Sequence, residues 1–101
     1  MSKLTIPSKF KCAGFDINIE FIDKLDSNDY GNWCDVTNVI KLAKNISLAS
    51  GELTPLQNRQ IENTFLHELY HVFQFYSGKR YSEEECNMFA NFMLEYFESK
   101  Q

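Results

Sequence analysis

Hydrophobic and polar residues alternate in the first half of the chain and recur at helical spacing in the second half. Four apolar residues separated by polar ones predict a half-buried strand: Phe15, Ile17, Ile19 and Phe21. The polar segment 23–29 predicts a turn, and shorter strands are predicted within 30–35 and 39–42. Three short sequential strands favour an antiparallel meander, and segment 45–53 is predicted to be a loop.

The first predicted helix has clear start and stop signals. Thr54 suits the N-cap, Pro55 the first helical position, and Gln57 the capping box, while Gly78 ends the helix. Six apolar residues recur at helical spacing and predict its buried stripe: Ile61, Phe65, Leu69, Val72, Phe73 and Tyr76.

The second predicted helix begins after Ser82, an N-cap with Glu85 as its capping-box partner. Its apolar face is predicted from six residues: Met88, Phe89, Phe92, Met93, Tyr96 and Phe97. The short link 77–81 predicts that the two helices are roughly antiparallel neighbours. Together the patterns predict an α+β fold, in which a small antiparallel sheet of about three strands packs on two helices.

Composition and charge restrict the function. A chain of 101 residues with 44% hydrophobic residues predicts one globular domain over residues 1–101. The net charge of −4 gives little support to a nucleic-acid partner. No apolar run is long enough for a membrane span, and residues 1–7 lack the apolar segment of a secretory signal. We therefore expect a cytoplasmic protein with no membrane partner. Three widely spaced cysteines, at 12, 34 and 86, are interpreted as partly buried thiols.

The segment His67-Glu68-Leu69-Tyr70-His71 is an H-E-x-x-H motif that contains both histidines of the chain. On a helix, residues four apart project from the same face, so both imidazoles can bind one metal ion. Glu68 then lies beside that ion, where its carboxylate can accept a proton from an activated water molecule. The motif predicts a zinc site with His67 and His71 as ligands and Glu68 as the general base.

A catalytic zinc site normally has three protein ligands, and the chain has no third histidine. The metzincin continuation also fails, because Gln74 and Ser77 replace its glycine and histidine. A carboxylate must therefore complete the site, and Glu83, Glu84 and Glu85 are the best candidates. All three can instead simply interact with the partial positive charge at the N-terminus of the second helix. Glu83 is preferred because Asn87, four residues later, can steady a ligand from the same face.

The motifs together resemble a known family. Segment 66–71 with the downstream Glu83-Glu84-Glu85-Cys86-Asn87-Met88-Phe89-Ala90 resembles the ImmA/IrrE family of zinc metallopeptidases, which pairs H-E-L-x-H with E-x-x-A-N-x-F-A. The resemblance places His67 and His71 on the zinc ligands, Glu68 on the catalytic glutamate and Glu83 on the third ligand. It covers about thirty residues. Cys86 replaces the usual alanine, and the interval from His71 to Glu83 is short for the family.

This resemblance implies a minimal, gluzincin-like zincin domain of the kind found beside phage or mobile-element genes. It implies a zinc metalloendopeptidase that hydrolyses a peptide bond of a specific cytosolic protein, with Glu68 moving the proton. The oxyanion donor is left open among Tyr30, Tyr70 and Tyr81, and a substrate strand is expected to add along 39–42. The alternative is a non-catalytic, zinc-stabilised module that binds another protein. A DNA-associated protease is disfavoured by charge, and the oligomeric state is left open.

Overall fold

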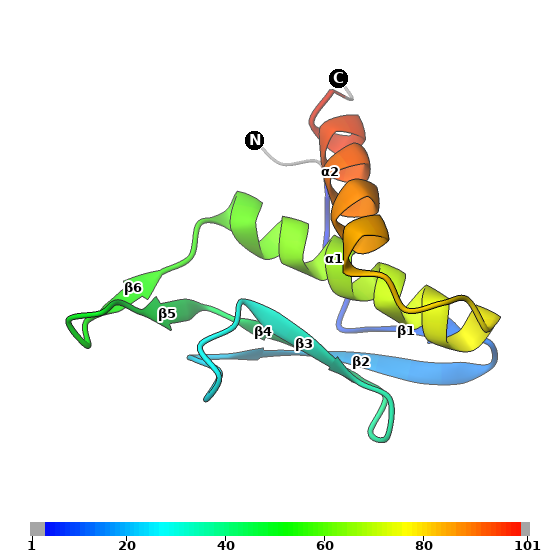
Figure 1. Cartoon of the computed structure of the whole chain (residues 1–101), viewed down its shortest axis with the longest axis horizontal. Coiled ribbons are helices and arrows are strands. Elements are labelled where there is room, and N and C mark those ends of the chain that lie inside the picture. Colours follow the sequence, from blue (N-terminus) through cyan, green and yellow to red (C-terminus); the bar gives the residue numbers. More distant parts are fainter. Residues whose placement is uncertain (1–3, 100–101) are drawn as a thin grey trace.

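Strands occupy the first half of the chain and two helices the second half (Figure 1). The structure is a computed structural model that describes residues 4–99. Its strands are β1 (Lys9–Cys12), β2 (Phe15–Ile22), β3 (Gly31–Cys34), β4 (Val39–Ala43), β5 (Asn45–Ser47) and β6 (Leu53–Pro55). Its helices are α1 (Asn58–Ser77) and α2 (Glu83–Ser99). The predicted α+β class is confirmed. Residues 1–3 of the segment considered for an export signal lie outside the described residues.

The main sheet is mixed and has four strands in the order β1-β2-β4-β3. The predicted antiparallel meander of three strands is therefore wrong, because β2 pairs with β4 in parallel. Only β3 and β4 form the expected hairpin, across a turn in which Asn38 has a positive φ of 56°. The connection 23–30 carries the chain past β4, so β3 becomes an edge strand. Leu25 within this connection is buried and anchors it.

Strand β1 was missed by the sequence pattern. It pairs with β2 through a two-residue turn, Ala13-Gly14, in which both residues have positive φ angles of 53° and 85°. This is the conformation of a tight hairpin turn that follows the twist of its strands. The residues of β1 alternate between exposed and partly buried, but with only four residues and no fully buried side chain β1 is too short for this alternation to stand out in the sequence.

Helix α1 begins later than predicted. Thr54 pairs with Ile46 in the β5–β6 hairpin, and the Leu56 N–H donates to the Lys44 carbonyl at 2.8 Å. The backbone of residues 54–56 therefore forms sheet-type hydrogen bonds, and Thr54 is not an N-cap. Segment 45–53, predicted to be a loop, contains strand β5 and the start of β6. Gln57 is the N-cap instead, and its capping-box partner is Gln60.

The other helix ends agree with the sequence. Gly78 adopts a φ of 72° after α1, which is the left-handed conformation that favours glycine at this position. The Ser82 hydroxyl accepts a hydrogen bond from the Glu85 backbone N–H at 3.1 Å and so caps α2. The helices run side by side in opposite directions, since Arg59 contacts Glu98 at one end and His71 contacts Glu83 at the other. Figure 1 shows that their axes cross obliquely.

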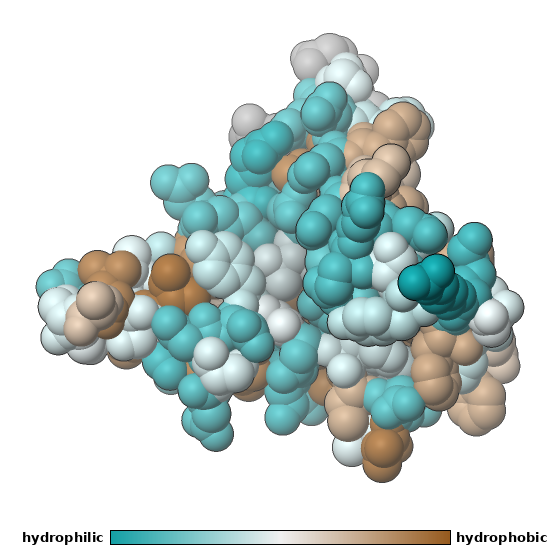
Figure 2. All heavy atoms as spheres, in the orientation of Figure 1, coloured by the Kyte–Doolittle hydropathy of each residue, from teal (hydrophilic) through white to brown (hydrophobic). Residues whose placement is uncertain are grey.

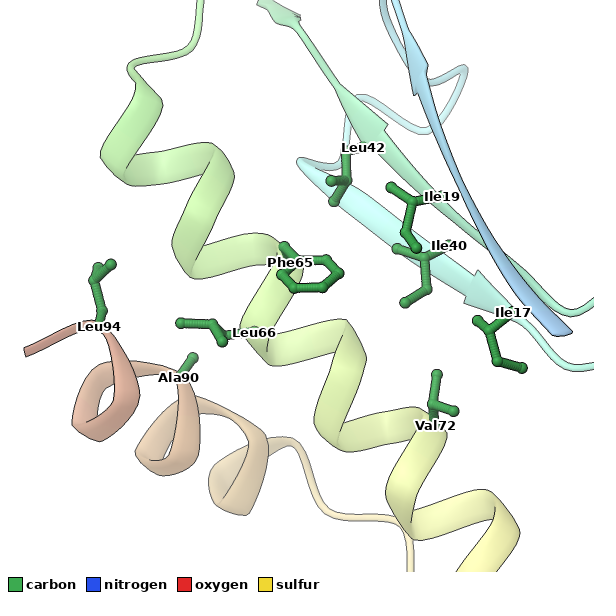
Figure 3. Packing of buried hydrophobic residues seen from close by; sticks show 9 residues of the cluster. All are labelled: Ile17, Ile19, Ile40, Leu42, Phe65, Leu66, Val72, Ala90 and Leu94. Carbon is green, nitrogen blue, oxygen red and sulfur yellow. The ribbon is translucent and has the colours of Figure 1, made fainter. Parts of the chain in front are cut away.

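The core lies between the sheet and α1 and continues between α1 and α2 (Figure 3). Its buried members come from both layers: Ile17, Ile19, Ile40, Leu42, Phe65, Leu66, Val72, Ala90 and Leu94. On α1, Leu66 joins the predicted stripe, whereas Phe73 is exposed. On α2, the small residues Cys86 and Ala90 face α1, which allows the two helices to approach closely.

Several apolar side chains stay outside this core. Figure 2 shows apolar atoms at the end of the β5–β6 hairpin and at the turn between β3 and β4, where Leu53 and Val36 are exposed. On α2, Met88, Phe92 and Tyr96 are exposed, so half of its predicted apolar face is wrong. Within residues 4–99, no helix is both long and apolar enough to cross a membrane.

Candidate metal centre

A pocket of about 480 Å³ opens between α1, the start of α2 and the edge strand β3. Its walls contain both histidines of the motif and several acidic and amide side chains. The lining residues are Asp29, Tyr30, Gly31, Asn32, Trp33, Asn63, Thr64, His67, Glu68, His71, Tyr81, Glu83 and Asn87. The structure thus brings His67, Glu68, His71 and Glu83, the four predicted site residues, into one pocket.

The two histidines and Glu83 face one another. The Nε2 atom of His67 lies 3.1 Å from Oε2 of Glu83, and Nε2 of His71 lies 2.6 Å from Oε1 of the same carboxylate. The imidazoles come from consecutive turns of α1, with ring centroids 4.9 Å apart. Glu83 is the first residue of α2, so the antiparallel helix pair sets its position. Two imidazole nitrogens and a carboxylate oxygen make up the His2Glu donor set typical of catalytic zinc.

Glu83 is the member of the acidic triplet that reaches the histidines. The Glu85 side chain accepts a hydrogen bond from the Tyr70 hydroxyl at 3.4 Å, and its backbone is bound to the Ser82 cap. Glu84 is exposed. A hydrogen bond from the Tyr81 hydroxyl at 2.5 Å, helped by the charges of the two histidines, lowers the pKa of Glu83. Glu83 is therefore kept as a carboxylate, the form that binds a cation.

Glu68 lies in the same pocket but is nearly enclosed, with only 8% of its surface exposed. Burial raises its pKa from 4.5 to about 7, and the negative charges of Glu83 and Asp29 add to the effect. A carboxyl group with a pKa near neutrality can both accept and release a proton at physiological pH. This is the property required of the predicted general base.

The buried side of His71 carries a second group of polar atoms. Its Nδ1 atom lies 3.1 Å from Oε1 of Gln74 and 3.3 Å from Sγ of Cys86. His67, His71 and Cys86 each offer a ligand atom within 4.8 Å of the others, so this group could hold a metal ion. However, burial raises the pKa of the Cys86 thiol to about 12, which keeps it protonated. The Nε2 side, which faces Glu83, is therefore the better metal site.

The edge strand beside the pocket is β3, not segment 39–42. Strand β4, which contains that segment, lies between β2 and β3, so its backbone is already paired on both sides. The predicted docking edge was therefore wrong. Gly31 of β3 packs against α1, where an added Cβ would lie 2.6 Å from the Thr64 methyl group. This close contact requires glycine and holds the open edge of the sheet over the pocket.

The structure narrows the set of tyrosines near the site. Tyr81 and Tyr30 line the pocket, whereas the Tyr70 hydroxyl is directed to Glu85. The Tyr81 ring stacks on the His71 ring with centroids 4.6 Å apart. Asn87, predicted to steady a ligand, also lines the pocket.

The contact between Gln74 and Nδ1 of His71 was not predicted from the sequence, in which Gln74 is only a departure from the metzincin pattern. Its position three residues after His71 places it on the same side of α1. That spacing was the available signal.

Comparison of the chain with protein-family models, with curated proteins and with solved structures finds no match. The functional assignment therefore depends on the residues of the pocket and on the motif resemblance.

Proposed function

We propose that this protein is a zinc-dependent metallopeptidase of the ImmA/IrrE type. The observation that supports it most is the position of the Glu83 carboxylate, whose two oxygens face Nε2 of His67 and Nε2 of His71. This donor set matches that of gluzincins, in which two histidines of H-E-x-x-H and a later glutamate hold the metal. When bound, zinc supplies Lewis acidity, which makes a water molecule more acidic and a carbonyl carbon more electrophilic.

Side chains of the pocket would bind the metal ion and transfer the proton. His67, His71 and Glu83 hold and orient the ion. Glu68 accepts the proton of the attacking water on its carboxylate and then delivers it to the leaving amine. Burial suits Glu68 to both steps, because a pKa of about 7 keeps the free energies of its charged and neutral forms close at neutral pH.

The open edge of β3 is the proposed substrate-binding element. An extended peptide that pairs with this edge lies along one wall of the pocket, and the histidines of α1 line the same pocket. The Tyr81 hydroxyl donates a hydrogen bond to Glu83 at 2.5 Å, so it lies beside a proposed metal ligand, whereas the Tyr70 hydroxyl donates to Glu85. We assign Tyr81 the role of the oxyanion donor, with Tyr30, which also lines the pocket, as the other candidate.

A second candidate function is a structural zinc site in a protein-binding module. The nearness of Cys86 to the two histidines favours it, because a fourth protein ligand would close the metal site to water. The protonated state of the buried thiol opposes it. The two functions differ in whether the metal keeps a position for water.

The decisive test replaces Glu68 by glutamine and measures zinc content and cleavage of a mixture of fluorescence-quenched peptides. The variant should retain one zinc per chain and lose cleavage by a factor of 100 or more, of the order expected for loss of a general base (about 10²–10⁴). Glu62→Gln is the matched control, because Glu62 lies on the same helix, is equally enclosed at 8% exposure and does not line the pocket. Cleavage by Glu68→Gln at the wild-type rate would exclude Glu68 as the base.

A further inference from the structure

Gln74 is a buried polar residue, only 2% exposed, on the side of His71 that faces away from Glu83. Its Oε1 atom lies 3.1 Å from Nδ1 of His71 and 3.6 Å from Sγ of Cys86. Its Nε2 atom donates to the Ser82 carbonyl at 3.2 Å, and the Ser82 N–H points back to Oε1 at 3.5 Å. One amide group therefore joins a metal-facing histidine of α1 to the residue that precedes Glu83.

The backbone of Ser82 determines which way this amide points. A carbonyl oxygen can only accept hydrogen bonds, so the NH2 group of Gln74 must face it. The Oε1 atom is then turned to His71, where it can only accept. Nδ1 of His71 must consequently carry a hydrogen. Its Nε2 atom, 2.6 Å from the Glu83 carboxylate, donates to that carboxylate in the metal-free protein and offers a lone pair only when a metal ion replaces this hydrogen.

We propose that Gln74 is a positioning residue for the metal centre, which fixes His71 as the Nδ1–H form and ties the start of α2 to the same helix. The metal-binding part of this proposal rests on the proposed function. The physical reason is that a metal-bound histidine usually donates its other ring N–H to a fixed acceptor, which orients the ring. Here the acceptor also anchors Ser82, so one side chain sets the position of His71 and, through the adjacent backbone, of Glu83.

Cys86 is the competitor for this role. Its Sγ atom lies 3.3 Å from Nδ1 of His71, so a thiol hydrogen could be directed to that nitrogen. In that arrangement Nδ1 would carry no hydrogen, and the Gln74 oxygen would face it without a bond. A thiolate at the same position could also bind the metal together with the histidines. The experiments must therefore separate Gln74 from Cys86.

The first experiment needs no substitution and no metal. In the chelator-treated wild-type protein, NMR of the ¹⁵N-labelled chain should show side-chain amide protons of Gln74 that exchange slowly with water, because one is buried in a hydrogen bond to Ser82. Fast-exchanging amide protons would mean that the amide is not anchored and would overturn the proposal. This result does not depend on zinc binding or on peptidase activity.

The second experiment uses the zinc-loaded protein and the ring signals of its histidines. The chain has two histidines, and the ring of His71 is assigned by its through-space contacts with the Tyr81 ring, on which it stacks with centroids 4.6 Å apart. The wild type and Cys86→Ala should both show a proton on Nδ1 of His71 that exchanges slowly, whereas in Gln74→Met this proton should exchange fast. Absence of this proton from the wild type would assign the role to Cys86 instead, because a thiol that donates to Nδ1 leaves that nitrogen without a hydrogen. Persistence of the slow signal in Gln74→Met would also overturn the proposal.

Metal affinity gives an independent readout. Gln74→Met should bind zinc about 10–100-fold more weakly, the loss typical when the partner of a ligating histidine is removed. Cys86→Ala should stay within about threefold of the wild type, since a thiol that is not a ligand adds little. Cobalt substitution tests the remaining alternative: a thiolate-to-cobalt absorption band that disappears in Cys86→Ala would place the metal on the Nδ1 side and overturn the proposal.

Discussion

Glu68 should make the metal-free protein less stable as the pH rises, and Glu68→Gln should remove this effect. The carboxyl group has a pKa of 4.5 when the chain is unfolded and about 7 in the folded protein, chiefly because it is buried. Between these values the folded state holds a proton that the unfolded state has released, so the free energy of unfolding falls as the pH rises. Below 4.5 both states are protonated, and the full advantage of the neutral side chain is present.

The size of the effect follows from the two pKa values. Each pKa unit corresponds to about 1.4 kcal/mol, so the full loss is about 3 kcal/mol, of which roughly 2–3 kcal/mol falls between pH 5 and pH 8. Glutamine resembles the protonated acid and cannot ionise. The free energy of unfolding of Glu68→Gln minus that of the wild type should therefore increase by this amount from pH 5 to pH 8.

Urea denaturation in the presence of a chelator measures this difference. At slopes of about 1–3 kcal/mol/M, the midpoint of Glu68→Gln should exceed that of the wild type by roughly 1–2 M at pH 8 and by much less at pH 5. Glu52→Gln is the control, because Glu52 is exposed in the β5–β6 hairpin and its substitution should change stability by less than about 0.5 kcal/mol. Groups present in both proteins cancel in the difference.

Zinc should reverse much of the pH effect, since a nearby cation favours the ionised carboxylate. A stability difference that is the same at pH 5 and pH 8 in the metal-free protein would refute the reasoning. It would mean that the folded protein does not hold Glu68 in its neutral form at pH 5–7.

Three further predictions concern the metal and the core. Glu83→Ala should weaken zinc affinity by more than about tenfold, whereas the control Glu84→Ala, which removes the same charge from the next residue, should leave the affinity nearly unchanged. Competition with a chromogenic chelator measures both affinities. The reverse order would move the third ligand along α2. Free zinc at 100 times its Kd should stabilise the protein by about 2.7 kcal/mol, so chelation should lower the melting temperature by roughly 10–20 °C. An unchanged melting curve would argue against a metal site. Leu66→Ala should lower the free energy of unfolding, measured by urea denaturation, by about 2–5 kcal/mol, because Leu66 is 2% exposed and packs between α1 and α2. A loss below about 1 kcal/mol would contradict this packing.

Local signals in the sequence were sufficient for several features. The alternation around Ile17 and Ile19 predicted β2, and Gly78 predicted the end of α1. The capping role of Ser82 was also recognisable, because a cap depends on hydrogen bonds within a few residues. The four-residue spacing of His67 and His71 placed both on one face of a helix before any tertiary contact was known.

Other predictions failed because they depend on competition between distant segments. Thr54 is a good N-cap by local rules, yet pairing with Ile46 holds it in a strand. The parallel pairing of β2 and β4 depends on how the connection 23–30 crosses the sheet, which no local pattern encodes. On α2, two adjacent rows of apolar residues left the buried face ambiguous. The structure buries the face that contains Cys86, Ala90 and Leu94.

The sequence by itself determined which groups one helix turn could offer to a metal ion: two imidazoles on one face with a carboxylate beside them. Only the tertiary structure decided which acid of the triplet faces the histidines, which strand edge borders the pocket, and which group lies behind His71. The physical reason is that helical spacing is fixed by backbone hydrogen bonds between near neighbours. The positions of Glu83, β3 and Gln74 relative to Ser82 arise from packing between segments that are distant in the chain.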